Sequence, residues 1–158
     1  MASLKTIIDI FEAVATADTA ILEFKYGKVW DMNGKPSAQY PKILVESQPN
    51  WTTTGNRLNF GSKSIKKSYT IKVFAYDLYN TPERSAKNLW TKQSELEDKF
   101  ENYLAEVWVR LSAINGIGIE STRNGFHGYF EQHNSKLIQV YEEIKVTIPV
   151  ACTTGTFI

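Results

Sequence analysis

The feature that most constrains the fold is a long, uninterrupted helical pattern beginning midway along the chain. Residues 82–112 contain neither Gly nor Pro after Pro82 itself. Apolar side chains recur there at spacings of three, four and seven residues, which predicts one amphipathic helix about 45 Å long. A helix of that length must lie across a broad layer of other structure. Its predicted buried stripe comprises Leu89, Leu96, Phe100, Tyr103, Leu104, Val107 and Leu111, flanked by Trp90 and Trp108.

Signals at both ends support this helix. Asn80 or Thr81 is the predicted N-cap, and Pro82 suits the first turn because its missing N–H would be unpaired there anyway. Gly116 is the predicted C-cap. A second, shorter helix is predicted at residues 3–17, with Ser3 as its N-cap and a single apolar stripe.

The remaining chain has the period of two residues that is typical of strands. Residues 69–76 have apolar side chains on both faces, which indicates a central strand. Residues 123–125 (Arg-Asn-Gly) predict a turn between two short strands. The predicted strands cover residues 20–30, 42–47, 68–76, 116–122, 126–133 and 136–151, with another short one at 56–60 if that polar segment forms a hairpin.

The last strand has one irregularity in its pattern. Glu142 falls in the same phase as the apolar residues around it. Either a bulge near 141–143 shifts the register or the strand leaves the core there, and we favour the bulge. The predicted core places Ile71, Val73, Ile144, Val146 and Ile148 of the sheet under Leu96, Phe100, Tyr103 and Val107 of the long helix.

This order of elements predicts an α+β fold. It is a mainly antiparallel sheet with an N-terminal helix and one long central helix packed on one face. We expect a single domain over residues 1–158, with an extended loop or hairpin at about 48–67. Residues 152–158 are predicted to form a flexible tail, which either frays or docks on a neighbouring copy.

Composition argues against several classes of protein. The net charge is +1, whereas wholesale nucleic-acid binding calls for a large positive excess. The single cysteine, Cys152, excludes an internal disulfide and multi-cysteine zinc sites. No apolar run approaches the length of a membrane helix. Asp9, Glu12 and Asp18 interrupt the apolar N-terminal segment, which favours an amphipathic helix over a signal peptide.

The sequence contains no recognisable catalytic constellation. It lacks the phosphate-binding, dinucleotide-binding and hydrolase motifs. His127 and His133 could share a strand face, but no third metal ligand accompanies them in a standard motif. Adjacent Glu142 and Glu143 would point to opposite faces of a strand, so they do not form an acid–base pair. We therefore predict no catalytic, cofactor-binding or metal-binding residues.

Charged residues of opposite sign gather in two separate segments. Either both are solvated surfaces, or the basic segment of one copy docks on the acidic segment of the next in a head-to-tail contact. The candidate interface residues are Arg57, Lys63, Lys66 and Lys67 in the basic segment, and Glu95, Glu97, Asp98 and Glu101 in the acidic one.

Four stretches together resemble the tail terminator, or tail completion, proteins of long-tailed bacteriophages. They are residues 3–14 (SLKTIIDIFEAV), 68–79 (SYTIKVFAYDLY), 83–108 (ERSAKNLWTKQSELEDKFENYLAEVW) and 136–150 (KLIQVYEEIKVTIPV). The resemblance lies in the order of the elements and in the general character of their sequences. The central helix is longer and more aromatic than that family leads us to expect, which leaves another neck or ring protein open.

The resemblance implies a structural virion protein without catalytic residues or cofactors. It implies a ring of identical subunits, commonly a hexamer, that ends the tail tube and joins it to the neck or head connector. The expected partners are other copies, the tail tube protein and a neck or connector protein, with no membrane and no specific nucleic acid, although a genome could pass through the ring. We expect assembly in the host cytoplasm and a place in the virion.

Two other functions remain open at this point. A long helix on a curved antiparallel sheet also describes small ligand-binding or lyase-like α+β barrels, which need a deep pocket with a few polar groups. A ring component of a contractile or secretion apparatus is the other alternative.

Overall fold

The computed structural model describes residues 3–27, 40–46, 49–54, 66–78, 86–114, 116–132 and 135–149. For residues 54, 86–88, 120–132 and 135–136 it describes the backbone alone. The described elements are α1 (Leu4–Ala17), β1 (Glu23–Gly27), β2 (Lys42–Glu46), β3 (Asn50–Thr54), β4 (Lys66–Leu78), α2 (Ala86–Ser112), β5 (Gly118–Gln132) and β6 (Ser135–Pro149).

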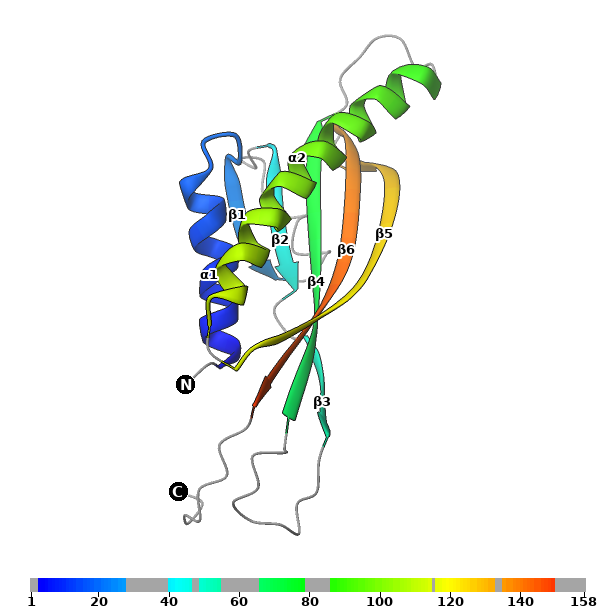
Figure 1. The fold of residues 1–158 in the computed structure, drawn as a ribbon. Coiled ribbons are helices and arrows are strands. Elements are labelled where there is room, and N and C mark those ends of the chain that lie inside the picture. Colours follow the sequence, from blue (N-terminus) through cyan, green and yellow to red (C-terminus); the bar gives the residue numbers. More distant parts are fainter. Residues whose placement is uncertain are drawn as a thin grey trace.

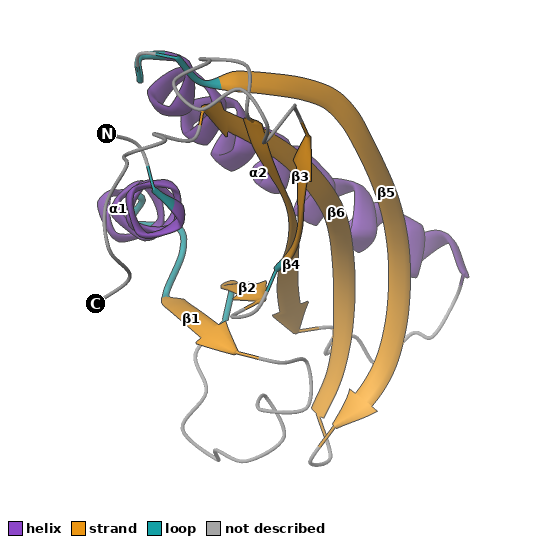
Figure 2. Ribbon diagram, turned by 90° about the horizontal axis from the view of Figure 1, so that it is seen from below, coloured by secondary structure: helices purple, strands orange, loops and turns teal. Residues whose placement is uncertain are grey.

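The strands form one sheet in the order β1-β2-β4-β6-β5, with β3 also paired to β4. The pairing of β1 with β2 is parallel, and the other pairings are antiparallel. β6 pairs with β4 along its whole length, so β2 and β3 follow one another along the opposite edge of β4. β4 is therefore the central strand, as its two-sided pattern predicts. Figure 2 shows β6 and β5 curving together through a wide arc.

Both helices pack on one face of this sheet, which confirms the predicted α+β class (Figure 1). α2 crosses β4 and β6 diagonally, and α1 lies beside it near β1 and β2. The N-cap prediction for α1 is confirmed, because the Ser3 hydroxyl accepts a hydrogen bond from the Thr6 amide at 3.2 Å. Predicted caps of α2 at Asn80, Thr81 and Pro82 lie outside the described residues.

The predicted core is confirmed in full. All nine residues named from the sequence belong to one buried cluster between the sheet and the helices, and Phe100 is only 1% exposed. α1 contributes to the same cluster. The sheet and α2 residues are Ile71, Val73, Ile144, Val146, Ile148, Leu96, Phe100, Tyr103 and Val107, and the buried α1 residues are Ile7, Phe11, Val14 and Ala15.

The other face of the sheet has a smaller apolar cluster. Leu44, Phe74 and Tyr76 are buried there, with Tyr40 and Tyr141 packed against them. The rings of Phe74 and Tyr141 stack with centroids 4.8 Å apart. β4 is thus buried on both sides at its middle, which explains why its sequence reads as apolar in both phases.

The predicted turn at residues 123–125 is wrong. β5 runs as one strand from Gly118 to Gln132, paired to β6 throughout except for a register shift between Glu120 and Asn124. Glu120 pairs with Lys145 and Asn124 with Glu143, so three residues, 121–123, stand opposite Ile144 alone. Turn-forming residues also suit a bulge, because both features need backbone that departs from the regular ladder.

The predicted bulge in β6 near residues 141–143 is also wrong. β6 keeps one continuous register against β4, with Glu142 opposite Val73 and Ile144 opposite Ile71. Glu142 therefore stays in the core-facing phase, where it is 7% exposed. The irregularity lies instead in the neighbouring strand β5, at residues 121–123 opposite Ile144. β6 itself neither shifts its register nor leaves the core.

Two details of α2 differ from the sequence prediction. Trp90 does not widen the buried stripe, since it is 65% exposed, whereas Trp108 packs against the core in part. Figure 1 shows the reason, because the N-terminal turns of α2 extend beyond the sheet. Gly116 has the positive φ expected of a capping glycine, +80°, but it lies in the turn that leads to β5, four residues after α2 ends at Ser112.

Tyr103 links the two helices and offers a test of their packing. Its hydroxyl donates a 2.9 Å hydrogen bond to the Phe11 carbonyl, and burial raises its pKa far above the usual value near 10. Tyr103→Phe should lower the free energy of unfolding by about 1–2 kcal/mol, because the buried carbonyl loses its donor. Urea unfolding at pH 7 measures the change.

The same tyrosine predicts a pH dependence with a definite sign. Because the folded-state pKa is raised, its contribution is intact below about pH 10 and falls as pH rises above the unfolded-state pKa. The wild type should therefore lose stability above about pH 10 more steeply than Tyr103→Phe. Equal slopes for the two proteins between pH 9 and 11 would contradict this assignment.

Candidate functional site

One end of the sheet forms an arm whose tip projects beyond the helices. The arm consists of β3 with the paired residues 66–70 of β4 and 145–149 of β6. Figure 1 shows the ends of these segments extending below α1 and the C-terminal end of α2. Tyr69, Val146 and Ile148, in the same segments, still belong to the core cluster that packs against the helices. Within the arm, the hydroxyls of Ser68 and Thr147 lie 2.8 Å apart and connect β4 to β6. At about 3.3 Å per residue, five paired residues make the arm about 17 Å long.

An aromatic and cationic cluster occupies one face of the arm. Trp51 stands opposite Tyr69 in the ladder, and Lys67 lies one diagonal step away in the same phase. The Lys67 Nζ lies 4.2 Å from the Trp51 ring centroid and 5.5 Å from that of Tyr69. Trp51 nevertheless remains 55% exposed. Trp is enriched at contact surfaces between proteins, so the half-exposed Trp51 is a candidate contact residue.

The exposed surface of α2 is divided by charge. Residues seven or eleven positions apart lie on nearly the same side of an α-helix. Lys92, Lys99 and Arg110, the basic residues of segment 90–112, follow this spacing and lie on the side that faces α1. Two acids accompany them and pair with them. Glu95 lies 3.4 Å from Lys92, and Glu106 lies 3.1 Å from Arg110.

The side of α2 away from α1 is acidic. Trp90, Glu97, Glu101 and Trp108 follow one another at spacings of seven, four and seven residues, so they form a line along the helix. Asp98 adjoins this line and is exposed. Segment 90–112 has no basic residue on this side. We call Trp90, Glu97, Asp98, Glu101 and Trp108 the acidic stripe.

The structure thus brings together some of the interface residues predicted from the sequence and separates others. Lys66 and Lys67 lie in the arm, where Lys66 is exposed and Lys67 partly so. Glu97, Asp98 and Glu101 share the acidic stripe. Glu95 lies on the α1 side instead, because it is three residues from Lys92 and four from Lys99. Arg57 and Lys63 lie outside the described residues.

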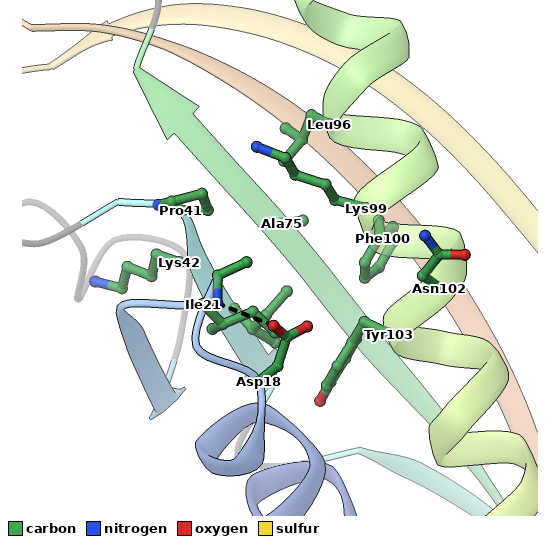
Figure 3. A pocket seen from close by; sticks show the side chains of 12 residues that line it. Asp18, Ile21, Pro41, Lys42, Ala75, Leu96, Lys99, Phe100, Asn102 and Tyr103 are labelled. Atoms are coloured by element: carbon green, nitrogen blue, oxygen red, sulfur yellow. Dashed lines mark hydrogen bonds between the residues drawn. The ribbon is translucent and has the colours of Figure 1, made fainter.

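A small pocket lies between the turn after α1, the start of β2 and the middle of α2 (Figure 3). Its volume is about 260 Å³. Its walls are mainly apolar. Three polar residues line its edge, Asp18 just after α1 and Lys99 and Asn102 on α2. A shallower hollow of about 210 Å³ continues from it between α1 and α2. The apolar lining of the pocket includes Ile21, Pro41, Ile43, Ala75, Leu96 and Phe100.

Several polar groups in this pocket serve the fold. The Asp18 Oδ1 accepts a 2.9 Å hydrogen bond from the Ala20 amide and so shapes the turn after α1. Lys42 points away from the pocket in Figure 3 and lies 3.8 Å from Glu23. The described residues of the lining include no His, Cys, Ser or Thr. The pocket could hold a small apolar group, but its walls supply no nucleophile paired with a base.

The other residues considered for chemistry do not form a site among the described side chains. The described part of the chain contains no group of three potential metal ligands. His127 lies on β5 without a described side chain, and His133 and Cys152 lie outside the described residues. Glu142 is buried, whereas Glu143 on the opposite face accepts a hydrogen bond from Tyr141.

Neither α1 nor the described part of α2 is long and apolar enough to span a bilayer.

No protein-family model matches the chain, and no curated protein sequence is detectably similar to it. Sequence reasoning missed Trp51 as part of the basic surface, because its place under Lys67 depends on the register between β3 and β4. It also missed the pocket, whose walls come from four separate segments of the chain, residues 18–21, 41–43, 75 and 96–103.

Proposed function

We propose that this protein is a structural component of a phage virion, and that a ring of its copies ends the tail tube and joins it to the neck or head connector. The arm is the observation that carries the proposal. Its tip extends past the helices, and it exposes Trp51 and Lys66, with Lys67 partly exposed, none of which belongs to the core cluster. Exposed aromatic and charged residues on a projection are suited to contact with another molecule.

The division of charge supports association between identical copies. A basic arm and an acidic stripe on one chain are two different surfaces of opposite sign. Their contact is heterologous, and a heterologous contact closes into a ring when the rotation between copies allows. Charge at such a contact sets orientation and rate of association more than affinity. The resemblance to tail terminator proteins in the order of elements supports the same class and a hexamer.

The proposed function is geometric and includes no catalysis and no cofactor. A ring can stop the growth of a tube by occupying its last layer, and its second face is then presented to the connector. The partners in this proposal are further copies, the tail tube protein and a neck or connector protein. A ring component of a contractile or secretion apparatus would share this geometry, and the identity of the bound tube separates the two.

The experiment is to mix the purified protein with assembled tail tubes of the virus that encodes it, and to image them by electron microscopy. We expect rings at one end of the tubes and no further elongation when tube protein is added. Capped tubes that still elongate, or rings that do not bind the tube, would contradict the proposal. A tube protein from an unrelated phage provides the control for specificity.

The pocket favours a second candidate, a ligand-binding α+β domain. At about 260 Å³ it is slightly smaller than the roughly 300–1,000 Å³ usual for ligand sites. Its lining is mainly apolar and includes Asp18, Lys42, Lys99, Asn102 and Tyr103, and the described residues supply no convergent set of buried donors and acceptors. We therefore favour ring assembly over ligand binding as the function of this protein.

A further inference from the structure

We propose that the acidic stripe on α2 of one copy receives the arm of the next copy, with Trp51 and Lys67 at the centre of the contact. This inference rests on the proposed ring and names the two surfaces that build it. It also predicts which acidic residues of α2 make the contact. Asp98 and Glu101 lie within it, whereas Glu95 and Glu106 lie outside it.

The two surfaces match in chemistry. The arm presents Trp51 with Lys67 beside it, while Lys66 lies on the opposite face of the same strand. The stripe presents carboxylates between two Trp residues. Trp90 is 65% exposed and Trp51 is 55% exposed, which are costly apolar surfaces to leave in water on an isolated subunit. Burying them together, with opposite charges alongside, gives a contact with an aromatic centre and a polar surround.

The two surfaces also match in size. Trp90 and Trp108 are eighteen residues apart, which places them about 27 Å apart along α2. Residues 118–120 of β5 pair with residues 145–147 of β6, so the arm is four strands wide there, about 14 Å between its outer strands, and three strands wide at its tip. It fits between the two Trp residues, over Glu97, Asp98 and Glu101.

The contact must be made between different copies. In Figure 1 the arm lies at the opposite end of the molecule from the N-terminal turns of α2. β3 is held to β4 by a ladder of five residue pairs, so Trp51 cannot swing to the stripe of its own chain. Glu97 and Glu101 also take part in contacts within the chain, and docking would add to these.

The test uses two complementary variants that should fail alone and succeed together. Lys66→Glu with Lys67→Glu makes the arm acidic, and Asp98→Lys with Glu101→Lys makes the stripe basic. Each variant opposes like charges at every contact, so association between its own copies should weaken at least about tenfold. In an equimolar mixture, each acidic arm meets a basic stripe and each basic arm meets an acidic stripe. Native mass spectrometry should then show rings with equal numbers of the two variants.

A matched control makes the same change on the other side of the helix. Glu95→Lys with Glu106→Lys alters two exposed carboxylates of α2 without touching the stripe, and rings should form as in the wild type. Circular dichroism and thermal unfolding check that every variant is folded.

The outcomes separate this inference from the proposed function. If the wild type forms rings but the mixture fails to restore them, or the Glu95/Glu106 control loses them equally, the arm and stripe are not the contact although the ring stands. If the wild type forms no ring under any condition, the proposed function fails and this inference falls with it.

Discussion

Replacing Phe100 by alanine should lower the free energy of unfolding by about 3–5 kcal/mol. Phe100 is 1% exposed at the middle of α2, where the helix crosses the sheet. Its ring stacks near that of Tyr103, with centroids 6.3 Å apart, and both line the pocket beside α1. Truncation would remove a large apolar contact and enlarge that pocket, because the neighbouring helix can relax only in part.

The matched control is Trp90→Ala on the same helix. Trp90 is a larger aromatic residue but is 65% exposed, so its loss should change stability by no more than about 0.5 kcal/mol in the isolated subunit. Denaturant unfolding at low protein concentration measures both. Equal effects of the two substitutions, or a loss below about 1.5 kcal/mol for Phe100→Ala, would show that α2 does not pack through this face.

Reversing the charge of Lys66 and Lys67 should abolish ring formation at micromolar concentration. Both lysines lie in the arm, and Lys67 stands over the exposed Trp51. A glutamate at position 67 would face the acidic stripe of the neighbouring copy, and one at position 66, on the opposite face of the strand, would remove a further positive charge from the arm. Repulsion would repeat at every contact around the ring. Raised salt should weaken the wild-type ring for the same reason, because exposed charges are screened within about 10 Å at 0.1 M.

Sedimentation velocity of the wild type and the double variant across a salt series measures both effects. Lys5→Glu with Lys92→Glu, which changes two exposed lysines outside the arm, is the control and should assemble normally. An unchanged ring in the Lys66/Lys67 variant would exclude the arm as the contact.

The sequence predicted the core well because periodicity and burial have the same cause. A helix that lies on a sheet must keep its apolar residues at spacings near 3.6, and the sheet beneath must alternate. Leu96, Phe100 and Val107 therefore identify the buried face of α2 without knowledge of topology, and Ile71 and Ile144 identify the face of the sheet.

The errors arose where one local pattern fits two structures. An Arg-Asn-Gly segment can end a strand or bulge within it, and the choice depends on whether β6 continues alongside, which it does. Glu142 in an apolar phase indicated an irregular strand. The irregularity lies on the partner strand, and Glu142 remains buried in register. Single-strand patterns do not reveal which of two paired strands holds the extra residues.

The candidate site was predicted in part. The acidic and basic segments are visible in the sequence, and helical spacing alone could have separated Glu95 from Glu97 and Glu101. The arm could not be predicted in the same way, because it depends on how far β4 and β6 extend past the helices. The position of Trp51 beside Lys67 depends on long-range pairing, for which a single sequence has no signal.

The mass of the purified wild-type protein in solution tests the central claim most directly. Native mass spectrometry or light scattering at low salt and micromolar concentration should give a closed oligomer, and six copies of the 18.0 kDa chain correspond to about 108 kDa. That mass should stay constant over a range of concentrations, because a closed ring has no free contact left to extend. A mass of 18.0 kDa at every salt and protein concentration, together with a melting temperature raised by a small apolar ligand, would contradict the ring and favour a ligand-binding domain instead.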